Sequence, residues 1–288
     1  MKKVLIVSSV ASMIDQFLIP HIKLLINNNY QVTVACNFIK GSTCNKVKIE
    51  ELKIKLNQMN VSFFQIDFSR NIINLFNNGK AYKQLKKIIN GEKFDLIYCH
   101  SPIGGVLSRL AARKKRKFGT KVIYMAHGFH FFKGSSLKNW LLFYPIEKFC
   151  SRFTDILITI NKEDYDFATR KMKANRIVYL PGVGIDLNKF KKVNVDRELK
   201  FKELGIPSDA IVFLSVGELN SNKNHELVIR AISNIDNVYY LVAGRGELNS
   251  YLINLVKKLN LENRVKLLGF RSDVNELCKI SNIYNAKL

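Results

Sequence analysis

The chain has 288 residues, of which 47% are hydrophobic and 24% charged, and these values exclude a disordered or fibrous protein. Lysine and arginine number 46 against 23 acidic residues, and the formal net charge of +23 favours a polyanion or an anionic membrane surface as a partner. The five cysteines lie far apart without a Cys-x-x-Cys pair, which argues against a disulfide framework or a structural zinc site and fits a reducing compartment.

The first residues allow two interpretations. Lys2 and Lys3 precede the apolar run Val4–Val10, as in a signal peptide, but this run is short for one and continues directly into an amphipathic helical pattern. We therefore predict a buried first strand, Lys3 to Ser9, in place of a signal peptide. No stretch reaches the roughly 20 apolar residues that a membrane span needs, so we expect any membrane contact to be peripheral.

Up to Leu180, short runs rich in Val, Ile, Tyr and Phe alternate with longer helical patterns. Continuous apolar strands separated by helices predict an α/β fold with a parallel, doubly wound sheet covered on both faces. The predicted strands are Val4–Ser8, Gln31–Ala35, Val61–Ile66, Asp95–Cys99, Lys121–Ala126, Asp155–Ile160 and Ile177–Leu180. The predicted helices lie near 14–28, 46–58, 71–90, 103–117, 137–151 and 162–173.

The pattern breaks at Pro181-Gly182-Val183-Gly184, which suits a turn or hinge, and a charged stretch continues to Pro207. A second cycle follows, with strands Ile211–Val216, Val238–Ala243 and Val265–Leu268 and helices near 223–234, 247–260 and 273–281. The sequence thus predicts two Rossmann-like domains, residues 1–190 and 191–288. The second is expected to be incomplete, because it has about three strands and residues 281–284 open another just before the last residue.

The positive charge is concentrated in the first predicted domain. Residues 1–190 carry 31 basic and 12 acidic side chains, a net charge of +19, whereas residues 191–288 carry 15 and 11, a net charge of +4. The basic run Arg113–Lys117 follows an apolar helix face formed by Ile103, Val106, Leu107 and Leu110. Two interpretations of the lysines stay open, a solvated surface or a contact with lipid headgroups.

His127 and Gly128 follow the strand Lys121–Ala126. Ligands of open α/β sheets bind beyond the carboxyl ends of the strands, so His127 is placed to donate a hydrogen bond to a sugar hydroxyl or a diphosphate. The alternative is a loop histidine that only packs locally. For His130, within a Phe-His-Phe-Phe run, packing is the favoured interpretation.

Glycines also follow each strand of the second cycle. The first strand is followed by Gly217 and Glu218, and the second is followed by Gly244, Arg245 and Gly246. The third is followed by Gly269, Phe270 and Arg271. Lys223 opens the next helix, where free N–H groups and the helix dipole attract phosphate. An ordinary exposed lysine is the alternative, but three glycine-bearing strand ends together favour a nucleotide pocket.

Other nucleotide and hydrolase motifs are missing from the sequence. It contains no Gly-x-x-x-x-Gly-Lys-Ser/Thr loop, which excludes P-loop ATP hydrolysis, and no Gly-x-Ser-x-Gly elbow. The Ser8-Ser9 turn after the first strand lacks the dinucleotide fingerprint of dehydrogenases.

Five segments in order resemble family 4 glycosyltransferases, particularly their bacterial capsular and exopolysaccharide branch. They are Tyr-Met-Ala-His-Gly-Phe-His-Phe-Phe (124–132), Leu-Pro-Gly-Val-Gly-Ile-Asp (180–186), Ser-Val-Gly-Glu-Leu-Asn-x-x-Lys-Asn-His (215–225), Val-Ala-Gly-Arg-Gly (242–246) and Arg-Val-Lys-Leu-Leu-Gly-Phe-Arg-Ser-Asp-Val (264–274). The resemblance covers essentially the whole chain. It implies a GT-B fold, with an acceptor-binding first domain and a donor-binding second domain.

The resemblance also implies residue roles. His127, with Gly128 beside it, would face the donor sugar, and Lys223 would bind the diphosphate. Gly217, Glu218, Gly244 and Gly246 would line the nucleotide, and Phe270 and Arg271 would lie near its base. Such enzymes generally retain the anomeric configuration and use neither a metal nor a further cofactor; the expected donor is a nucleotide-sugar, commonly a uridine diphosphate sugar.

The branch commonly extends lipid-linked glycans at the cytoplasmic membrane face, so the resemblance implies a cytoplasmic protein, peripheral at the inner face of the cell membrane. Two features depart from the family: Glu218 stands where many members have arginine, and the chain ends before a later pair of glutamates. The expectation is a truncated transferase whose activity is open. The alternatives are a non-catalytic pseudoenzyme, one subunit of a two-chain transferase, a nucleotide-sugar epimerase or, on charge alone, a nucleic-acid-binding protein.

Overall fold

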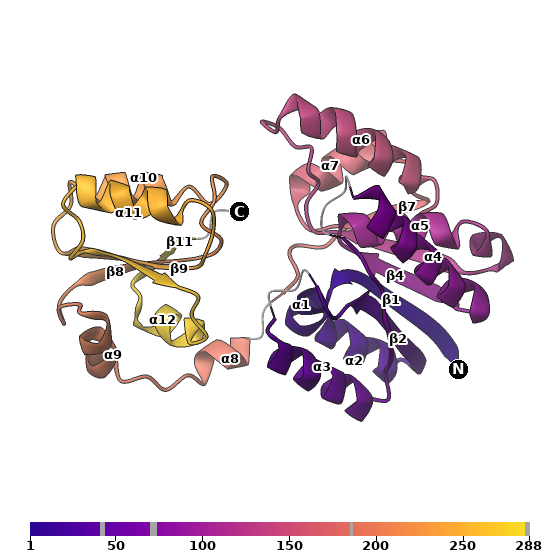
Figure 1. Cartoon of the computed structure of the whole chain (residues 1–288), viewed down its shortest axis with the longest axis horizontal. Coiled ribbons are helices and arrows are strands. Elements are labelled where there is room, and N and C mark those ends of the chain that lie inside the picture. Colours follow the sequence, from indigo (N-terminus) through magenta and orange to yellow (C-terminus); the bar gives the residue numbers. More distant parts are fainter. Residues whose placement is uncertain (41–43, 70–73, 185–186, 286–288) are drawn as a thin grey trace. The chain divides into compact units, whose positions relative to one another are not determined.

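The computed structural model describes residues 1–40, 44–69, 74–184 and 187–285. The chain divides into two compact units, Met1–Gly184 (unit 1) and Ile185–Leu288 (unit 2). The division comes at the Pro181–Gly184 turn, somewhat before the boundary at 190 that the sequence analysis places. Each unit is a parallel sheet with helices on both faces (Figure 1).

The sheet of unit 1 has the strand order β3-β2-β1-β4-β5-β6-β7, and every described pairing is parallel. The order reverses between β1 and β4, which creates a crevice at their carboxyl ends. The strands are β1 (Lys2–Val10), β2 (Tyr30–Asn37), β3 (Ser62–Gln65), β4 (Leu96–His100), β5 (Lys121–Ala126), β6 (Ile156–Thr159) and β7 (Arg176–Tyr179).

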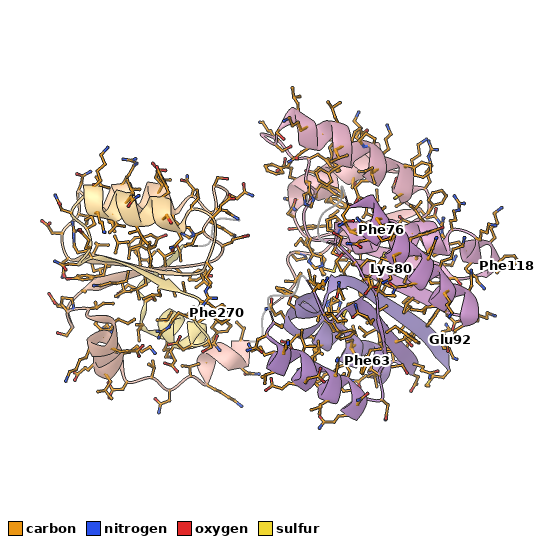
Figure 2. The ribbon with its side chains drawn as sticks, viewed as in Figure 1. Phe63, Phe76, Lys80, Glu92, Phe118 and Phe270 are labelled. Carbon is orange, nitrogen blue, oxygen red and sulfur yellow. The ribbon has the colours of Figure 1, made fainter. Side chains whose placement is uncertain are left out.

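Alternate residues of β1 enter two separate cores. Leu5 and Val7 face the core under the helices between Leu75 and Lys171, whereas Val4 and Ile6 face the core under the helices between Ala11 and Gln58. At the β3 edge, Phe63 closes the second core by packing on Phe38, with ring centroids 5.4 Å apart (Figure 2). Because β1 is buried on both faces, its central residues Val4–Val7 form a continuous apolar run, and the prediction of a buried strand at Lys3–Ser9 is correct.

The helices of unit 1 follow the predicted positions, with two differences. The predicted helix 14–28 begins earlier and contains a π-helical turn, and the predicted helix 103–117 ends at Ala112, followed by a separate 3-10 turn. The elements are α1 (Ala11–Met13), η1 (Ile14–Leu18), α2 (Ile19–Asn27), α3 (Lys46–Gln58), α4 (Leu75–Gly91), α5 (Pro102–Ala112), η2 (Lys115–Phe118), α6 (Leu137–Ser151) and α7 (Lys162–Lys171).

Within its described residues, unit 2 has the sheet order β10-β9-β8-β11, so the order reverses between β8 and β11. The fourth strand, β11 (Ile283–Asn285), is the strand that residues 281–284 were expected to open, and it pairs with β8 in parallel. The other strands are β8 (Ile211–Val216), β9 (Val238–Ala243) and β10 (Val265–Gly269).

Helices again cover both faces of this second sheet: α10 (His225–Ile232) and α11 (Asn249–Lys258) lie on one, and α9 (Arg197–Leu204) and α12 (Val274–Ile280) on the other. Helix α9 and the short α8 (Leu187–Lys191) were not predicted from the sequence, because their segment is charged and weakly periodic. Helix α9 nevertheless buries Phe201 and Leu204 in the core. None of the helices in the described part of the chain is both long and apolar enough to span a bilayer.

Candidate active site

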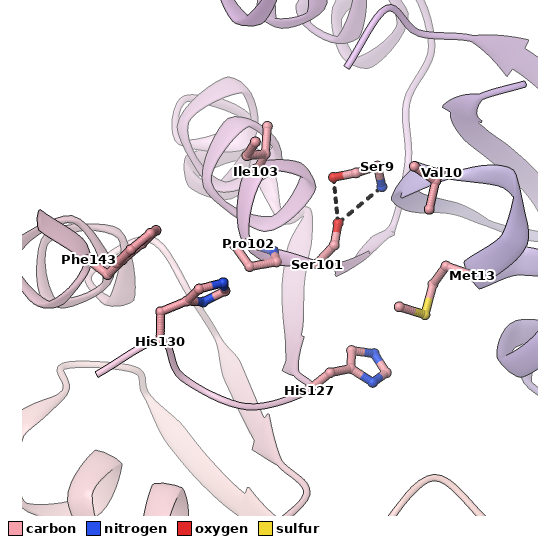
Figure 3. A pocket seen from close by; sticks show the side chains of 9 residues that line it. All are labelled: Ser9, Val10, Met13, Ser101, Pro102, Ile103, His127, His130 and Phe143. Atoms are coloured by element: carbon pink, nitrogen blue, oxygen red, sulfur yellow. Dashed lines mark hydrogen bonds between the residues drawn. The ribbon is translucent and has the colours of Figure 1, made fainter. Parts of the chain in front are cut away.

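A pocket of about 340 Å³ opens at the reversal point of the unit 1 sheet (Figure 3). Three strands supply its lining at their carboxyl ends, as expected for an open α/β sheet. The lining residues are Ser9, Val10 and Met13 after β1, Ser101, Pro102 and Ile103 after β4, His127 and His130 after β5, and Phe143 of α6.

Two serines join β1 to β4 at the floor of this pocket. Ser9 donates its backbone N–H to Ser101 Oγ (3.0 Å), and the two hydroxyl oxygens lie 2.7 Å apart (Figure 3). Gly104 donates its N–H to Ser9 Oγ, and a Cβ at Gly104 would lie 2.9 Å from Ser101 Oγ. Ser101 itself has φ +62°, a left-handed conformation that costs a residue with a side chain energy. The strand ends are therefore held in a fixed, closely packed turn.

His127 lies at the pocket with a buried histidine behind it. The Nε2 atom of His127 is 3.2 Å from Nδ1 of His100, and His100 Nε2 is buried without a partner among the described residues. Burial lowers the pKa of His127, and His21 adds a smaller effect in the same direction. Burial lowers the pKa of His100 well below its ordinary value, assisted by His127 and His21. Both imidazoles are therefore neutral at pH 7, which suits His127 to donating a hydrogen bond to a hydroxyl.

The loop after β5 is anchored by the first turn of α7. Phe129 donates its N–H to the Asp164 carboxylate (2.9 Å), and Lys133 donates to Glu163 (2.8 Å). Gly128 has φ +127°, a conformation that favours glycine, so this position allows the chain to turn directly after His127. His130, expected to pack, does stack on Phe143 with ring centroids 4.5 Å apart, but it also lines the pocket.

In unit 2 the glycines after β8 and β9 face each other. A Cβ on Gly244 would lie 1.7 Å from the carbonyl oxygen of Gly217, and one on Gly246 would lie 2.3 Å from that of Leu219. Gly217 and Leu219 donate their N–H groups to the carbonyls of Ala243 and Arg245, both at 3.0 Å. Glycine is thus required at 244 and 246 by the close approach of the two backbones. That these glycines line a nucleotide, as the family resemblance implies, stays a prediction.

Lys223 lies at the start of α10, with its side-chain stem over Gly217. A Cβ on Gly217 would be 3.4 Å from Lys223 Cε. The Lys223 N–H donates to Asn220 Oδ1 (3.1 Å), and the next residue, Asn224, takes a left-handed conformation with φ +46°. The Lys223 side chain therefore lies at the end of β8, where the order of the strands in this sheet reverses. The amino end of α10 lies at the same place.

His225, the first residue of α10, holds the loop after β8 in place. It is buried, its Nδ1 lies 3.0 Å from Tyr240 Oη, and its Nε2 lies 3.3 Å from the Glu218 carbonyl oxygen. Tyr240 in turn donates to Ser215 Oγ (2.8 Å). This chain of contacts fixes the Glu218 backbone, while the Glu218 carboxylate is exposed and accepts from the Asn220 side chain.

Arg271, which the resemblance places near the base of the nucleotide, is held by acidic side chains of unit 2. Its guanidinium donates to both carboxylate oxygens of Asp273 (2.7 and 2.6 Å) and to Glu203 (2.7 Å). These carboxylates raise the pKa of Arg271, and Lys200 joins the same network. Arg271 therefore ties α9 to the β10–α12 turn. Phe270 is exposed (Figure 2), with the Arg245 guanidinium 5.8 Å from its ring centroid.

Sequence reasoning did not single out Ser101 and His100 and used Ser9 only to exclude a dinucleotide motif. Their position directly after β1 or at the end of β4 was the available signal, because those two strands flank the reversal point. Within the described ranges, no group of three or more His, Cys, Asp or Glu side chains is arranged to hold a metal ion.

Two family models match the chain, one in each unit. The model for "Glycosyl transferase 4-like" proteins matches residues 3–161, and that for "Glycosyl transferases group 1" matches residues 196–287. Each match takes in the strand-end loops described above, with His127 in the first and Lys223 in the second.

Two curated bacterial proteins resemble the chain over most of its length. The putative glycosyltransferase EpsD of Bacillus subtilis is 40% identical over 72% of this chain and 56% of its own length. An Escherichia coli galactosyltransferase, which by its name transfers galactose from UDP-galactose to N-acetylglucosamine-diphosphoundecaprenol, is 32% identical over 77% of this chain and 59% of its own length. The chain thus spans less than two thirds of these relatives.

Solved structures show the same fold at low sequence identity. HepE of Anabaena, in complex with UDP-glucose, superposes with a TM-score of 0.72 at 18% identity, covering 99% of this chain and 73% of HepE. WaaG, a glycosyltransferase of lipopolysaccharide biosynthesis, gives a TM-score of 0.68 at 15% identity over 98% of this chain and 74% of its own.

Proposed function

The chain belongs to the 4-like glycosyl transferases and has the GT-B fold, and from this we propose that it takes part in transferring a sugar from a nucleotide-sugar to a lipid-linked glycan. Unit 2 is proposed to bind the donor and unit 1 the acceptor. The proposed setting is polysaccharide synthesis at the cytoplasmic face of the membrane. The acceptor class is supported by the E. coli relative, whose named acceptor is a diphospholipid-linked sugar, and by the net charge of +19 in residues 1–190.

The observation that carries the proposal is the position of Lys223. It lies across Gly217 at the end of β8 and beside the amino end of α10, so an ammonium group and a helix dipole act at the same strand end. During transfer, the acceptor oxygen bonds to the anomeric carbon while the bond from that carbon to the diphosphate oxygen breaks, and the proton of the acceptor hydroxyl passes to the leaving diphosphate. Negative charge grows on the leaving diphosphate, and Lys223 stabilises it electrostatically.

His127 is proposed to contact the donor sugar. Its ring is neutral at pH 7 because burial lowers its pKa, and its Nε2 is already directed to His100. The Nδ1 side of the ring then remains for a sugar hydroxyl. Neither role requires a metal ion, and the proposed donor is a uridine diphosphate sugar, as bound by HepE.

Thermal unfolding of the 288-residue chain, with and without a panel of uridine and guanosine diphosphate sugars, tests donor binding. A ligand that binds the folded state raises its stability by about 2.7 kcal/mol at a hundredfold excess over Kd. We expect one donor to raise the unfolding midpoint, and Lys223→Ala to abolish the increase. Lys257→Ala, which removes an exposed lysine of α11, is the matched control and keeps it. A midpoint that responds to no nucleotide would contradict donor binding by these residues.

A further inference from the structure

Helix α6 exposes a continuous face of apolar and basic side chains. At 3.6 residues per turn, the exposed positions between Leu137 and Arg152 fall within about 140° of one another around the helix axis. Leu137 and Leu141 keep 80% and 79% of their surface exposed. The residues of this surface, called the α6 face below, are Leu137, Lys138, Leu141, Leu142, Phe149 and Arg152.

The opposite side of α6 is packed into unit 1. Trp140 and Tyr144 meet edge to face, and Glu147 is buried in an ion pair with Arg109 (2.8 Å). Glu147 is the only acidic residue between 132 and 152. Because its charge is buried and paired, the outer side of the helix carries positive charge alone. A contiguous exposed apolar surface of this kind marks an interaction site.

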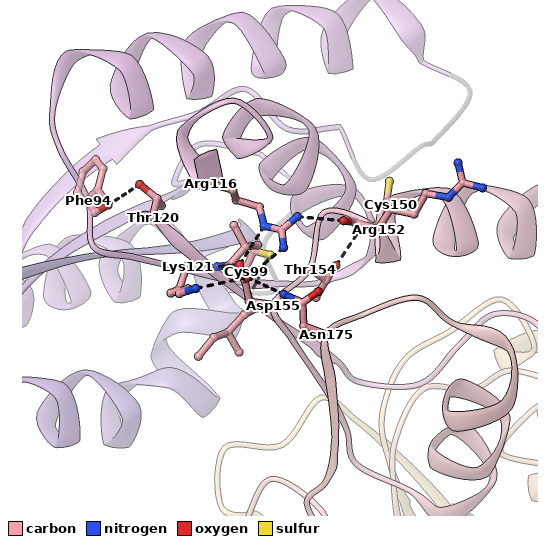
Figure 4. Close-up of polar contacts among 12 residues, drawn as sticks. Phe94, Cys99, Arg116, Thr120, Lys121, Cys150, Arg152, Thr154, Asp155 and Asn175 are labelled. Atoms are coloured by element: carbon pink, nitrogen blue, oxygen red, sulfur yellow. Dashed lines mark hydrogen bonds and ion pairs between the residues drawn. The ribbon is translucent and has the colours of Figure 1, made fainter. Parts of the chain in front are cut away.

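The 3-10 turn η2 lies at one end of the α6 face. Arg116 donates to both Asp155 carboxylate oxygens (2.9 and 3.0 Å) and to the Arg152 carbonyl oxygen (2.9 Å), which holds η2 beside the carboxyl end of α6 (Figure 4). The basic run Arg113–Lys117 therefore does not continue the apolar face of α5, as the sequence analysis expects. It adjoins the α6 face instead, and Phe118 at its end is 77% exposed and projects outward (Figure 2).

We propose that the α6 face and η2 together form a docking surface for an anionic lipid bilayer. Leu137, Leu141 and Phe118 enter the interfacial region, and the neighbouring lysines and arginines contact lipid phosphates. The inference rests on the proposed function in one respect only: docking is useful because it brings the enzyme to a lipid-linked acceptor.

The pocket of unit 1 shares this helix. Phe143 follows Leu142 in sequence but is turned to the other side of α6, where it lines the pocket and stacks on His130. A bilayer against the α6 face would therefore lie on the opposite side of this helix from the pocket of His127, about 10–12 Å away, which is the width of one helix.

Charge favours a bilayer over a second copy of the chain as the occupant. In a twofold dimer formed through this surface, the same basic residues would face one another, because both copies present the same patch. Lys138 and Arg152 would then meet like charges without a carboxylate to neutralise them. Anionic lipids supply that neutralising charge across the whole surface.

Vesicle flotation of the 288-residue chain, without donor or acceptor, tests the surface. We expect binding to phosphatidylcholine vesicles that contain phosphatidylglycerol, weaker binding to pure phosphatidylcholine, and a decline with added salt. The double variant L137Q/L141Q is expected to lower the partition coefficient at least tenfold, because two leucines no longer insert. The matched control is L199Q/L227Q, which changes two leucines of unit 2 that are 66% and 63% exposed, and it should bind like the unmodified chain.

Trp140 is the only tryptophan of the chain and lies on α6, so its emission reports whether the variant keeps this helix folded. With emission and unfolding midpoint unchanged, equal vesicle binding by the two double variants would overturn the proposal, as would absence of binding to anionic vesicles. Sedimentation velocity tests the alternative occupant. If the unmodified chain forms a dimer that L137Q/L141Q loses, and does not bind vesicles, the surface belongs to a second copy and the proposal is also overturned. Because no nucleotide is present, failure here is distinct from failure of the donor-binding test.

Discussion

Nδ1 of His100 lies 3.2 Å from Nε2 of His127, at the carboxyl ends of two neighbouring strands. The pairing of β4 with β5 places His100 opposite Met125, so His127 begins the loop directly beyond it. His100 is fully buried, and Tyr98 and His21 complete its aromatic surroundings. Both histidines have lowered pKa values, so one neutral ring donates to the other and the orientation of His127 depends on His100.

Stability should fall on acidification because His100 remains neutral in the folded chain. In the unfolded chain His100 regains its ordinary pKa of 6.5 and takes up a proton below that pH. The free energy of unfolding therefore decreases as pH is lowered through 6.5, by up to about 1.4 kcal/mol per pH unit for this one group. Urea unfolding at pH 7.5, 6.5 and 5.5 measures the slope. His100→Leu should flatten it, and an unchanged slope would contradict this assignment.

The ion pair between α5 and α6 should be a major determinant of the stability of unit 1. Arg109 and Glu147 are 1% and 9% exposed and 2.8 Å apart, and the Arg109 guanidinium lies 4.0 Å from the Tyr124 ring centroid. Glu147→Ala leaves a buried charge unpaired and is expected to cost about 3–5 kcal/mol in urea unfolding. Glu50→Gln, which breaks an exposed pair with Lys53, should cost under about 1 kcal/mol. Similar losses in the two variants would speak against the prediction.

Alanine at position 244 should disrupt the donor-side loops. Its Cβ would lie 1.7 Å from the Gly217 carbonyl oxygen, so one loop must move, at a cost of about 3 kcal/mol or more. The expected results are a lower unfolding midpoint for unit 2 and loss of the nucleotide-induced increase. Gly79→Ala is the control: Gly79 lies within α4, with nothing within 4 Å of an added Cβ, and alanine there should stabilise unit 1 by about 0.5–1 kcal/mol. A Gly244→Ala chain with normal stability would refute the backbone contact.

Arg271→Ala distinguishes a structural role from a base-binding role. Arg271 bonds to Asp273 and Glu203, and the same bonds lower the pKa of both carboxylates. Losing these charge-assisted bonds should cost about 1–3 kcal/mol, visible as a lower midpoint without ligand. The nucleotide-induced increase should survive. An unchanged midpoint with the increase lost would instead support the role near the base that the family resemblance implies.

The sequence by itself determined the positions of the main elements and the fold class. Strand β5 and helices α3 and α6 lie at their predicted bounds, because a run buried on both faces and a 3.6-residue apolar period are local signals. The glycines at three strand ends, with His127 and Lys223, were likewise visible as a pattern. Helix α9 escaped prediction because its segment is highly charged, although Phe201 and Leu204 anchor it in the core.

Only the tertiary structure decided which of these residues meet. Strand register brings His100 to His127, although 27 positions separate them. The β8 and β9 loops approach so closely that a side chain at 244 or 246 would collide with backbone. Arg271 bonds to Glu203 of α9, a helix that was not predicted from the sequence, and Arg116 anchors the basic run at the end of α6. Periodicity is set by neighbours along the chain, whereas such pairings depend on how strands and helices pack, and no local pattern encodes that.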